Sequence, residues 1–490
     1  NSALGVNALG ANTTGHNNVA IGNCMVANTT GYQNTAIGNS ALHANTTGQF
    51  NTAVGNTTLS ANTTGQKNVA VGAYALDANT EGNYNTGLGY HSLSENITGN
   101  YNTAVGMYSL DANTSGDNNT SVGYGSLGVN STGGSNVAVG AYALDANTTA
   151  SYNTALGSSS LGKTTTGHSN TAVGASSLED NTTGNENIAL GKAALANNTT
   201  GAANVGIGIN ALNVNTTGSS NTGVGTNALT AATTASYNVA FGRDALEANT
   251  TGANNCGIGA FALDANTTAN GNTALGYSTL SANTTGENNT AVGLEALLDN
   301  TTGSANTGVG DGALENNISG NDNVAIGRNA LMNNTTADKN HGLGRQTLYT
   351  NTTGANNTAA GYQALYSNTT ASDNAAFGMF SLYANTTGEM NAAVGKDSLK
   401  ANTTGNYNTG IGAFALTLNT TGVENTGIGK GALSANTTAS YGTAVGFHAL
   451  DLNTTGGQNT AVGSYALLSN TTGNQNVAVG TEALDANTTG

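Results

Sequence analysis

A 17-residue phrase close to N-T-A-V-G-x-x-A-L-x-A-N-T-T-G-x-x repeats through all 490 residues. One repeat of 17 residues (1–17), one of 16 (18–33), 26 of 17 (34–475) and a final 15 residues (476–490) fill the chain, giving about 29 coils. A fixed period of this length is typical of units that bury a core only by stacking on their neighbours. The sequence therefore predicts one continuous solenoid over residues 1–490, which we expect to be part of a longer fibre protein.

Variation between the repeats predicts which positions are buried. With position 1 set at Asn34, position 5 is glycine in every repeat, as at Gly38, and position 9 is leucine in all but one, as at Leu42. Position 4 is Val, Ile, Leu or Phe nearly everywhere and position 2 alternates between Thr and Val, so we expect positions 2, 4 and 9 to form the core. Charged residues gather at positions 6, 7, 10, 16 and 17 and are absent from positions 1 to 5. These five charged positions are expected to face water.

Position 3 is always Ala, Gly or Ser, as at Ala240, Gly257 and Ala274. Strand alternation points it away from positions 2 and 4, so we expect an outward site that another copy of the chain covers closely. Steric crowding within the coil is the alternative explanation for the small side chains.

Two short strands, at positions 2–5 and 8–11, are predicted in each repeat. A tight corner at the position-5 glycine and a wider turn across A-N-T-T-G-x-x would join them. Parallel stacking of successive coils would align the asparagines of position 12 into a ladder of side-chain amides. The predicted fold class is all-β, a parallel β-solenoid with a 17-residue repeat.

Composition excludes several classes of protein. The net charge of -16 and pI near 4.4 argue against nucleic-acid binding, which needs a basic surface. No apolar run approaches the roughly 20 residues of a membrane helix, so no membrane insertion is expected. Cys24 and Cys256 lie in distant coils, so we expect two buried thiols and no internal disulfide.

No catalytic, cofactor or metal site is predicted. The six histidines are scattered over different repeats without metal-ligand spacing: His16, His43, His91, His168, His341 and His448. No nucleophile motif, nucleotide loop or recurring carboxylate pair occurs, so the chain is not expected to be an enzyme. Asn-Thr-Thr matches the glycosylation sequon in most repeats, as at Asn45, although a turn and ladder role explains the asparagine without a sugar. Surface tyrosines such as Tyr74 could stack on glycans or be ordinary surface aromatics.

Three segments carry a resemblance to a known family: N-N-V-A-I-G at 17–22, N-T-A-I-G-N-S-A-L at 34–42 and N-V-A-V-G-A-Y-A-L at 68–76. They resemble the head repeat of trimeric autotransporter adhesins, the YadA-like left-handed β-roll, and the NTTG-containing arrays are similar to those of phage tail-fibre-type proteins. The resemblance covers the whole chain, although each repeat here is three residues longer than the adhesin head repeat. It implies a parallel homotrimer and a surface-exposed fibre.

Three functional hypotheses follow. The first is an extracellular structural or adhesive fibre at a cell surface or on a virion, which associates with itself as a trimer and has a glycan or cell-surface receptor as a possible partner. The second is an ice-binding solenoid, suggested by rows of threonine at positions 13 and 14, of which only one row could face ice. The third is a polysaccharide-cleaving enzyme, which would need a cluster of carboxylates or basic residues on neighbouring coils, and none recurs.

Overall fold

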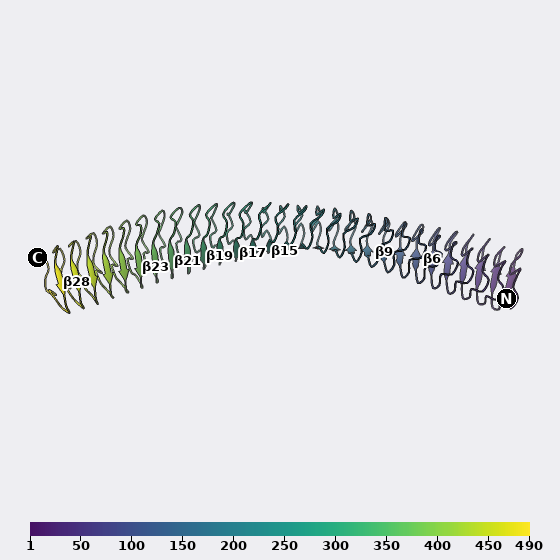
Figure 1. The fold of residues 1–490 in the computed structure, drawn as a ribbon, viewed down its shortest axis with the longest axis horizontal. Helices are drawn as coiled ribbons and strands as arrows, with labels where there is room; N and C mark the ends of the chain where they lie inside the picture. Colours follow the sequence, from purple (N-terminus) through teal and green to yellow (C-terminus); the bar gives the residue numbers. More distant parts are fainter. The chain divides into compact units, whose positions relative to one another are not determined.

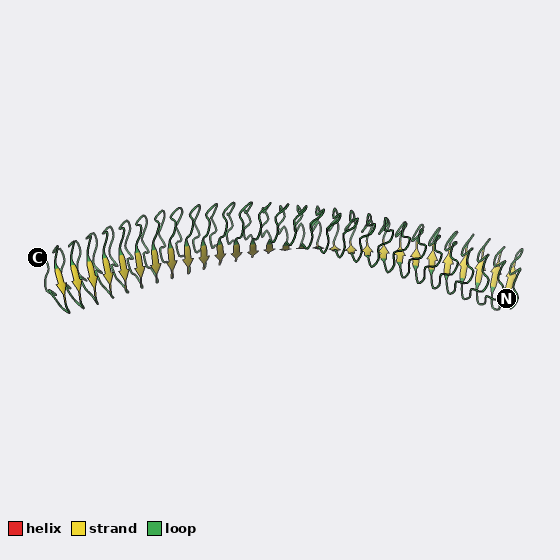
Figure 2. Cartoon of the chain, viewed as in Figure 1, coloured by secondary structure: helices red, strands yellow, loops and turns green.

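The computed structural model describes residues 1–490 as strands and turns without a helix (Figure 1, Figure 2). The chain divides into two compact units, Asn1–Asp244 and Ala245–Gly490. In each unit every repeat forms one coil with one three-residue strand at positions 2–4. Because there is no helix, none is present that could cross a bilayer.

The strands of the first unit are β1 (Ser2–Leu4), β2 (Val19–Ile21), β3 (Thr35–Ile37), β4 (Thr52–Val54), β5 (Val69–Val71), β6 (Thr86–Leu88), β7 (Thr103–Val105), β8 (Thr120–Val122), β9 (Val137–Val139), β10 (Thr154–Leu156), β11 (Thr171–Val173), β12 (Ile188–Leu190), β13 (Val205–Ile207), β14 (Thr222–Val224) and β15 (Val239–Phe241). Those of the second unit are β16 (Cys256–Ile258), β17 (Thr273–Leu275), β18 (Thr290–Val292), β19 (Thr307–Val309), β20 (Val324–Ile326), β21 (His341–Leu343), β22 (Thr358–Ala360), β23 (Ala375–Phe377), β24 (Ala392–Val394), β25 (Thr409–Ile411), β26 (Thr426–Ile428), β27 (Thr443–Val445), β28 (Thr460–Val462) and β29 (Val477–Val479).

Within each unit, consecutive strands pair in parallel with equal repeat positions opposite one another. In β10 and β11, for example, Thr154 faces Thr171, Ala155 faces Ala172 and Leu156 faces Val173. The chain therefore advances by one coil per 17-residue repeat, and the prediction of an all-β parallel solenoid is confirmed.

The predicted second strand, at positions 8–11, is wrong. Positions 6–11 form turns, because positions 7 and 9 take left-handed backbone angles, with φ of 59° at Ser40 and 49° at Leu42. This segment still bonds to the next coil: the Leu42 N–H donates to Thr58 O at 3.0 Å, and the Ala44 N–H donates to Ser60 O at 2.9 Å. A left-handed leucine is rare, so residue type gave no signal for this turn.

Strain at position 7 makes a testable prediction. Thr57 has φ of 56°, which is unfavourable for a β-branched residue, whereas asparagine occupies the same site and angle at Asn210 and Asn227. Thr57→Asn is therefore expected to raise the free energy of unfolding by about 1 kcal/mol. Urea titration monitored by circular dichroism measures the free energy of unfolding of the variant and of the natural protein. The control Thr47→Asn, at an exposed site without a positive φ, should change little, and an unchanged Thr57→Asn variant would contradict the strain.

The core of each coil is narrow. The position-9 leucine is its largest side chain and is fully buried in all coils except the terminal ones, for example at Leu246; Met25 replaces it in the 16-residue repeat. Around it lie the small side chains of positions 3 and 8 and the asparagines of positions 1 and 12. The prediction that position 9 is buried is confirmed.

Two asparagine ladders run through the coils. At position 12, Asn45 Nδ2 donates to Asn28 Oδ1 at 2.7 Å in the preceding coil and to Gly48 O at 3.1 Å in its own coil. At position 1, the Asn51 N–H donates to Asn34 Oδ1 at 2.9 Å, and Asn51 Nδ2 donates to Gly65 O at 2.9 Å. The predicted position-12 ladder is confirmed, and the position-1 ladder is an addition that sequence reasoning missed.

The position-5 glycine forms the corner after the strand. Gly174 has φ of +131°, and a Cβ built on it would lie 2.5 Å from Gly191 O and 2.6 Å from Gly191 C in the next coil. The predicted tight corner at this glycine is therefore confirmed, and both a positive φ and a close backbone approach require glycine there.

Candidate interaction surfaces

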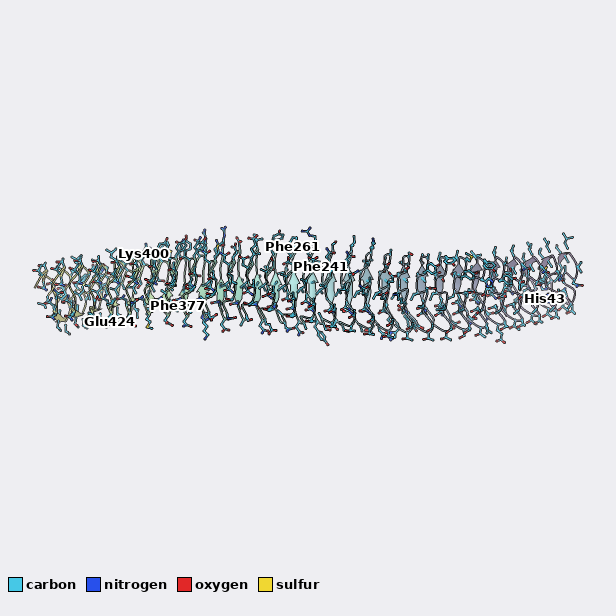
Figure 3. The ribbon with its side chains drawn as sticks, turned by 90° about the horizontal axis from the view of Figure 1, so that it is seen from above. His43, Phe241, Phe261, Phe377, Lys400 and Glu424 are labelled. Carbon is cyan, nitrogen blue, oxygen red and sulfur yellow. The ribbon has the colours of Figure 1, made fainter.

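The outward side chains of positions 2 and 4 form an exposed surface on each unit, which we call the strand face. Position 4 carries Val, Ile, Leu or Phe in nearly every strand, and its side chains are exposed to 45% at Leu275 and 57% at Phe241. Phe241 and Phe377, both labelled in Figure 3, belong to this face. Position 2 adds mainly Thr and Val, and no Asp, Glu, Lys or Arg occurs at either position.

The predicted orientation of the strand is therefore inverted. Positions 2 and 4 point outward, while position 3 points into the coil and is fully buried, as at Ala240 and Ala274. The space inside accepts only a methyl or hydroxymethyl group: a Cβ built on Gly206 would lie 3.2 Å from Leu195 Cγ and 3.2 Å from Ala211 O. Crowding within the coil explains why position 3 is small, and the proposed contact between copies at position 3 is wrong.

An uncharged, largely apolar strip along a parallel sheet is unusual for a surface that faces water. Sheets of parallel strands are normally covered on both faces, and large exposed apolar patches mark interaction sites. The strand face is therefore the main candidate interaction surface. Sequence reasoning missed it because the bulkiest aliphatic positions of a strand are normally its core positions.

Aromatic side chains form a second kind of surface, on the turns. Rings at positions 6 and 7 of five successive coils make mostly edge-to-face contacts, with centroids 5.7 Å apart for Tyr90 and Tyr108 and 5.2 Å apart for Tyr124 and Tyr142. At position 10, Tyr349 stacks on Tyr366 at 5.2 Å and Tyr366 stacks on Tyr383 at 5.3 Å. Neighbouring coils thus cover part of the ring faces within these stacks, whereas tyrosines outside them, such as Tyr152 and Tyr237, are 70% and 66% exposed.

Acidic side chains at position 10 lie half-buried beside the turns. Burial raises the pKa of the Asp77, Asp145 and Asp264 carboxyls, although contacts with His91 at Asp77 and with Ser281 at Asp264 oppose the rise. The folded state then holds these protons more tightly than the unfolded state, so stability falls as pH rises from the unfolded pKa near 3.9 through the raised folded pKa.

Asp145→Asn is accordingly expected to stabilise the first unit at pH 7, by on the order of 0.5 kcal/mol. Below about pH 3 the difference should vanish, because the aspartate is then mostly protonated in both states. Thermal melts at about pH 2.5 and pH 7 measure the effect, with Asp373→Asn at an exposed site as the control. A variant less stable than the natural protein at pH 7 would contradict the cost of burial.

The Asn-Thr-Thr asparagines are engaged within the coil. Asn283 is fully buried, and its Nδ2 donates to Asn266 Oδ1 at 3.0 Å and to Gly286 O at 3.0 Å. Attachment of a sugar needs this same nitrogen, so the folded coil leaves it no room. The turn and ladder interpretation of this asparagine is thus favoured over glycosylation.

The two cysteines differ in environment. Cys24 is fully buried as predicted, and Cys256 lies half-exposed at position 2 of β16, on the strand face, which corrects its expected burial. Burial raises the pKa of both thiols. No group of three or more His, Cys, Asp or Glu side chains comes together to hold a metal ion.

A scan against protein-family models finds no match, and a search of curated proteins likewise finds none. The class of the protein follows from its fold alone: it is a parallel β-solenoid repeat protein.

Proposed function

We propose that the chain is a structural segment of an extracellular filament in which copies pack in parallel through their strand faces as a homotrimer. The carrying observation is the strand face itself, which has no Asp, Glu, Lys or Arg and carries aliphatic side chains or threonine in coil after coil. Burying it between copies removes apolar area from water at about 25 cal/mol per Å². Rotational symmetry lets one repeated surface cover itself in register.

A filament role also fits the small core of each coil. Each coil has one leucine and several small side chains inside, while its larger aliphatic side chain at position 4 lies outside. A core shared between copies would use these outer side chains, which a single copy leaves in water. In this proposal the chain is a non-enzymatic spacer or adhesin shaft at a cell surface or on a virion.

Light scattering and cross-linking test the assembly. The natural chain is expected to be trimeric at micromolar concentration. Mild oxidation should link copies by a disulfide between their Cys256 residues, because the same residue of each copy lies at the same level in a parallel assembly. The buried Cys24 should stay reduced and acts as an internal control. A monomeric natural chain would overturn the proposal.

Charge on the strand face gives the matched comparison. The first variant has lysine on the strand face of β17, β18 and β19 through the combined substitutions Leu275→Lys, Val292→Lys and Val309→Lys. It is expected to yield folded monomers. The control, the position-14 lysine set, has the same charge at position 14 of the same coils through Thr285→Lys, Thr302→Lys and Ser319→Lys. It should leave the trimer intact. Loss of the trimer in both sets would point to charge alone instead of the strand face.

Ice binding is the second candidate, favoured by the exposed threonines of position 14. The position-13 hydroxyls are engaged, as when Thr284 Oγ1 donates to Thr301 O at 3.0 Å, whereas Thr285 is exposed in the same coil. The position-14 row is threonine except at Glu81, Ser115 and Ser319. Measurement of thermal hysteresis tests this candidate. Hysteresis in the natural chain and its loss in the position-14 lysine set would support ice binding, and absence of hysteresis in the natural chain would dismiss it.

A further inference from the structure

An open groove of about 450 Å³ lies over three successive coils of the second unit. Tyr383 comes from the coil of β23, Asp397 and Lys400 from the coil of β24, and Phe414 and Thr417 from the coil of β25. These residues occupy turn positions 7 and 10, so none belongs to the strand face. The volume falls in the range of small-molecule sites, roughly 300 to 1,000 Å³.

Asp397 is the only charged residue of the chain that is buried, with 6% of its surface exposed. A buried carboxylate is costly unless it is paired. Lys400 Nζ lies 2.8 Å from Asp397 Oδ1, and Lys396 Nζ lies 3.9 Å from Oδ2. The Asp397 main-chain carbonyl also accepts a hydrogen bond from Thr417 Oγ1 at 2.8 Å. The groove thus has a fixed polar side with a carboxylate and an ammonium group next to each other.

Aromatic rings supply the rest of the lining. Tyr383 is the last ring of the position-10 stack, because the next coil carries Lys400 at this position, labelled in Figure 3. Phe414 adds a second ring from the following coil, and the Lys400 ammonium also lies 4.9 Å from the centroid of Phe380. This combination interrupts the regular repeat, and the solenoid itself does not need it.

We propose that this groove binds one pyranose ring of a neutral saccharide. A pyranose has an apolar C–H face that suits an aromatic ring, and hydroxyl groups that both donate and accept hydrogen bonds. Two adjacent hydroxyls match the pair: one donates to Asp397 Oδ2, because Oδ1 is fully buried beside Lys400, and the other accepts from the Lys400 ammonium. Asp397 and Lys400 are the two charged residues that line the groove, and their charges compensate each other, whereas Lys396 lies outside the lining. This favours a neutral ligand over an acidic one.

Saturation-transfer NMR on the full chain tests the proposal with methyl glycosides of glucose, galactose, mannose and N-acetylglucosamine, and with glucuronic acid. At least one neutral glycoside should bind, with a Kd that rises roughly tenfold in Phe414→Ala and in Asp397→Asn, because a ring face or a hydrogen-bonding partner is lost. Tyr465→Ala, at position 7 of a coil outside the groove, should leave binding unchanged.

Lys400→Tyr combined with Asp397→Asn separates binding from folding. Tyrosine already occupies position 10 in the three preceding coils, and asparagine occupies position 7 at Asn210 and Asn227. The double variant leaves no unpaired buried charge, so it should fold and melt like the natural chain while binding is lost. Failure of all four neutral glycosides, binding of glucuronic acid alone, or unchanged binding in both Phe414→Ala and the double variant would overturn the proposal. Because no groove residue lies on the strand face, this result is independent of the trimer test.

Discussion

Replacing Ala274 with arginine is expected to unfold its part of the second unit, whereas replacing the next residue, Leu275, with arginine should leave the coil folded. Ala274 is fully buried, and Leu275 is 45% exposed. At the equivalent site of the preceding coil, a Cβ on Gly257 would lie 3.4 Å from Leu246 Cγ, so only a small side chain fits. A guanidinium cannot lose its charge there, and the cost is about 5 kcal/mol or more.

The pair of variants tests the direction of the strand directly. Circular dichroism with urea gives the free energy of unfolding, and hydrogen exchange locates the loss, since long repeat arrays need not unfold in one step. If Leu275→Arg were the damaging change and Ala274→Arg the tolerated one, the strand would face the other way.

Asn283→Asp is the second change with a large expected effect. The aspartate loses both donations made by Asn283 Nδ2, to Asn266 Oδ1 and Gly286 O, and places an unpaired charge in a fully buried site. The expected destabilisation at pH 7 is about 3 to 5 kcal/mol.

The loss from Asn283→Asp should be smaller at pH 4 than at pH 7. Burial disfavours the charged form, so the folded aspartate takes up a proton more readily than the unfolded one, and stability falls as pH rises. Urea titrations at the two pH values measure this difference. Asn288→Asp is the control, because position 17 is exposed and already carries aspartate at Asp322 and Asp373. Equal stability of Asn283→Asp and the natural protein at pH 7 would contradict a buried ladder.

The candidate surfaces were only partly predictable from the sequence. The charged residues of positions 6, 7, 10, 16 and 17 are exposed or half-buried as expected, with the exception of Asp397 at position 7, which is buried. The strand face was predicted as core, since its Val and Ile residues have the composition of core positions. The groove at Asp397 had no sequence signal, because its residues come from three coils and differ from the repeat in unrelated ways.

The sequence by itself determined the architecture. A 17-residue period fixes the stacking of coils, the glycine of position 5 fixes the corner, the leucine of position 9 marks the interior and the asparagine of position 12 predicts the ladder. Only the tertiary structure decided which way the strand faces. Alternation puts position 3 opposite positions 2 and 4 but does not say which side is inside. The space beside the position-9 leucine decides it: the coil admits only Ala, Gly or Ser, and the larger side chains must lie outside.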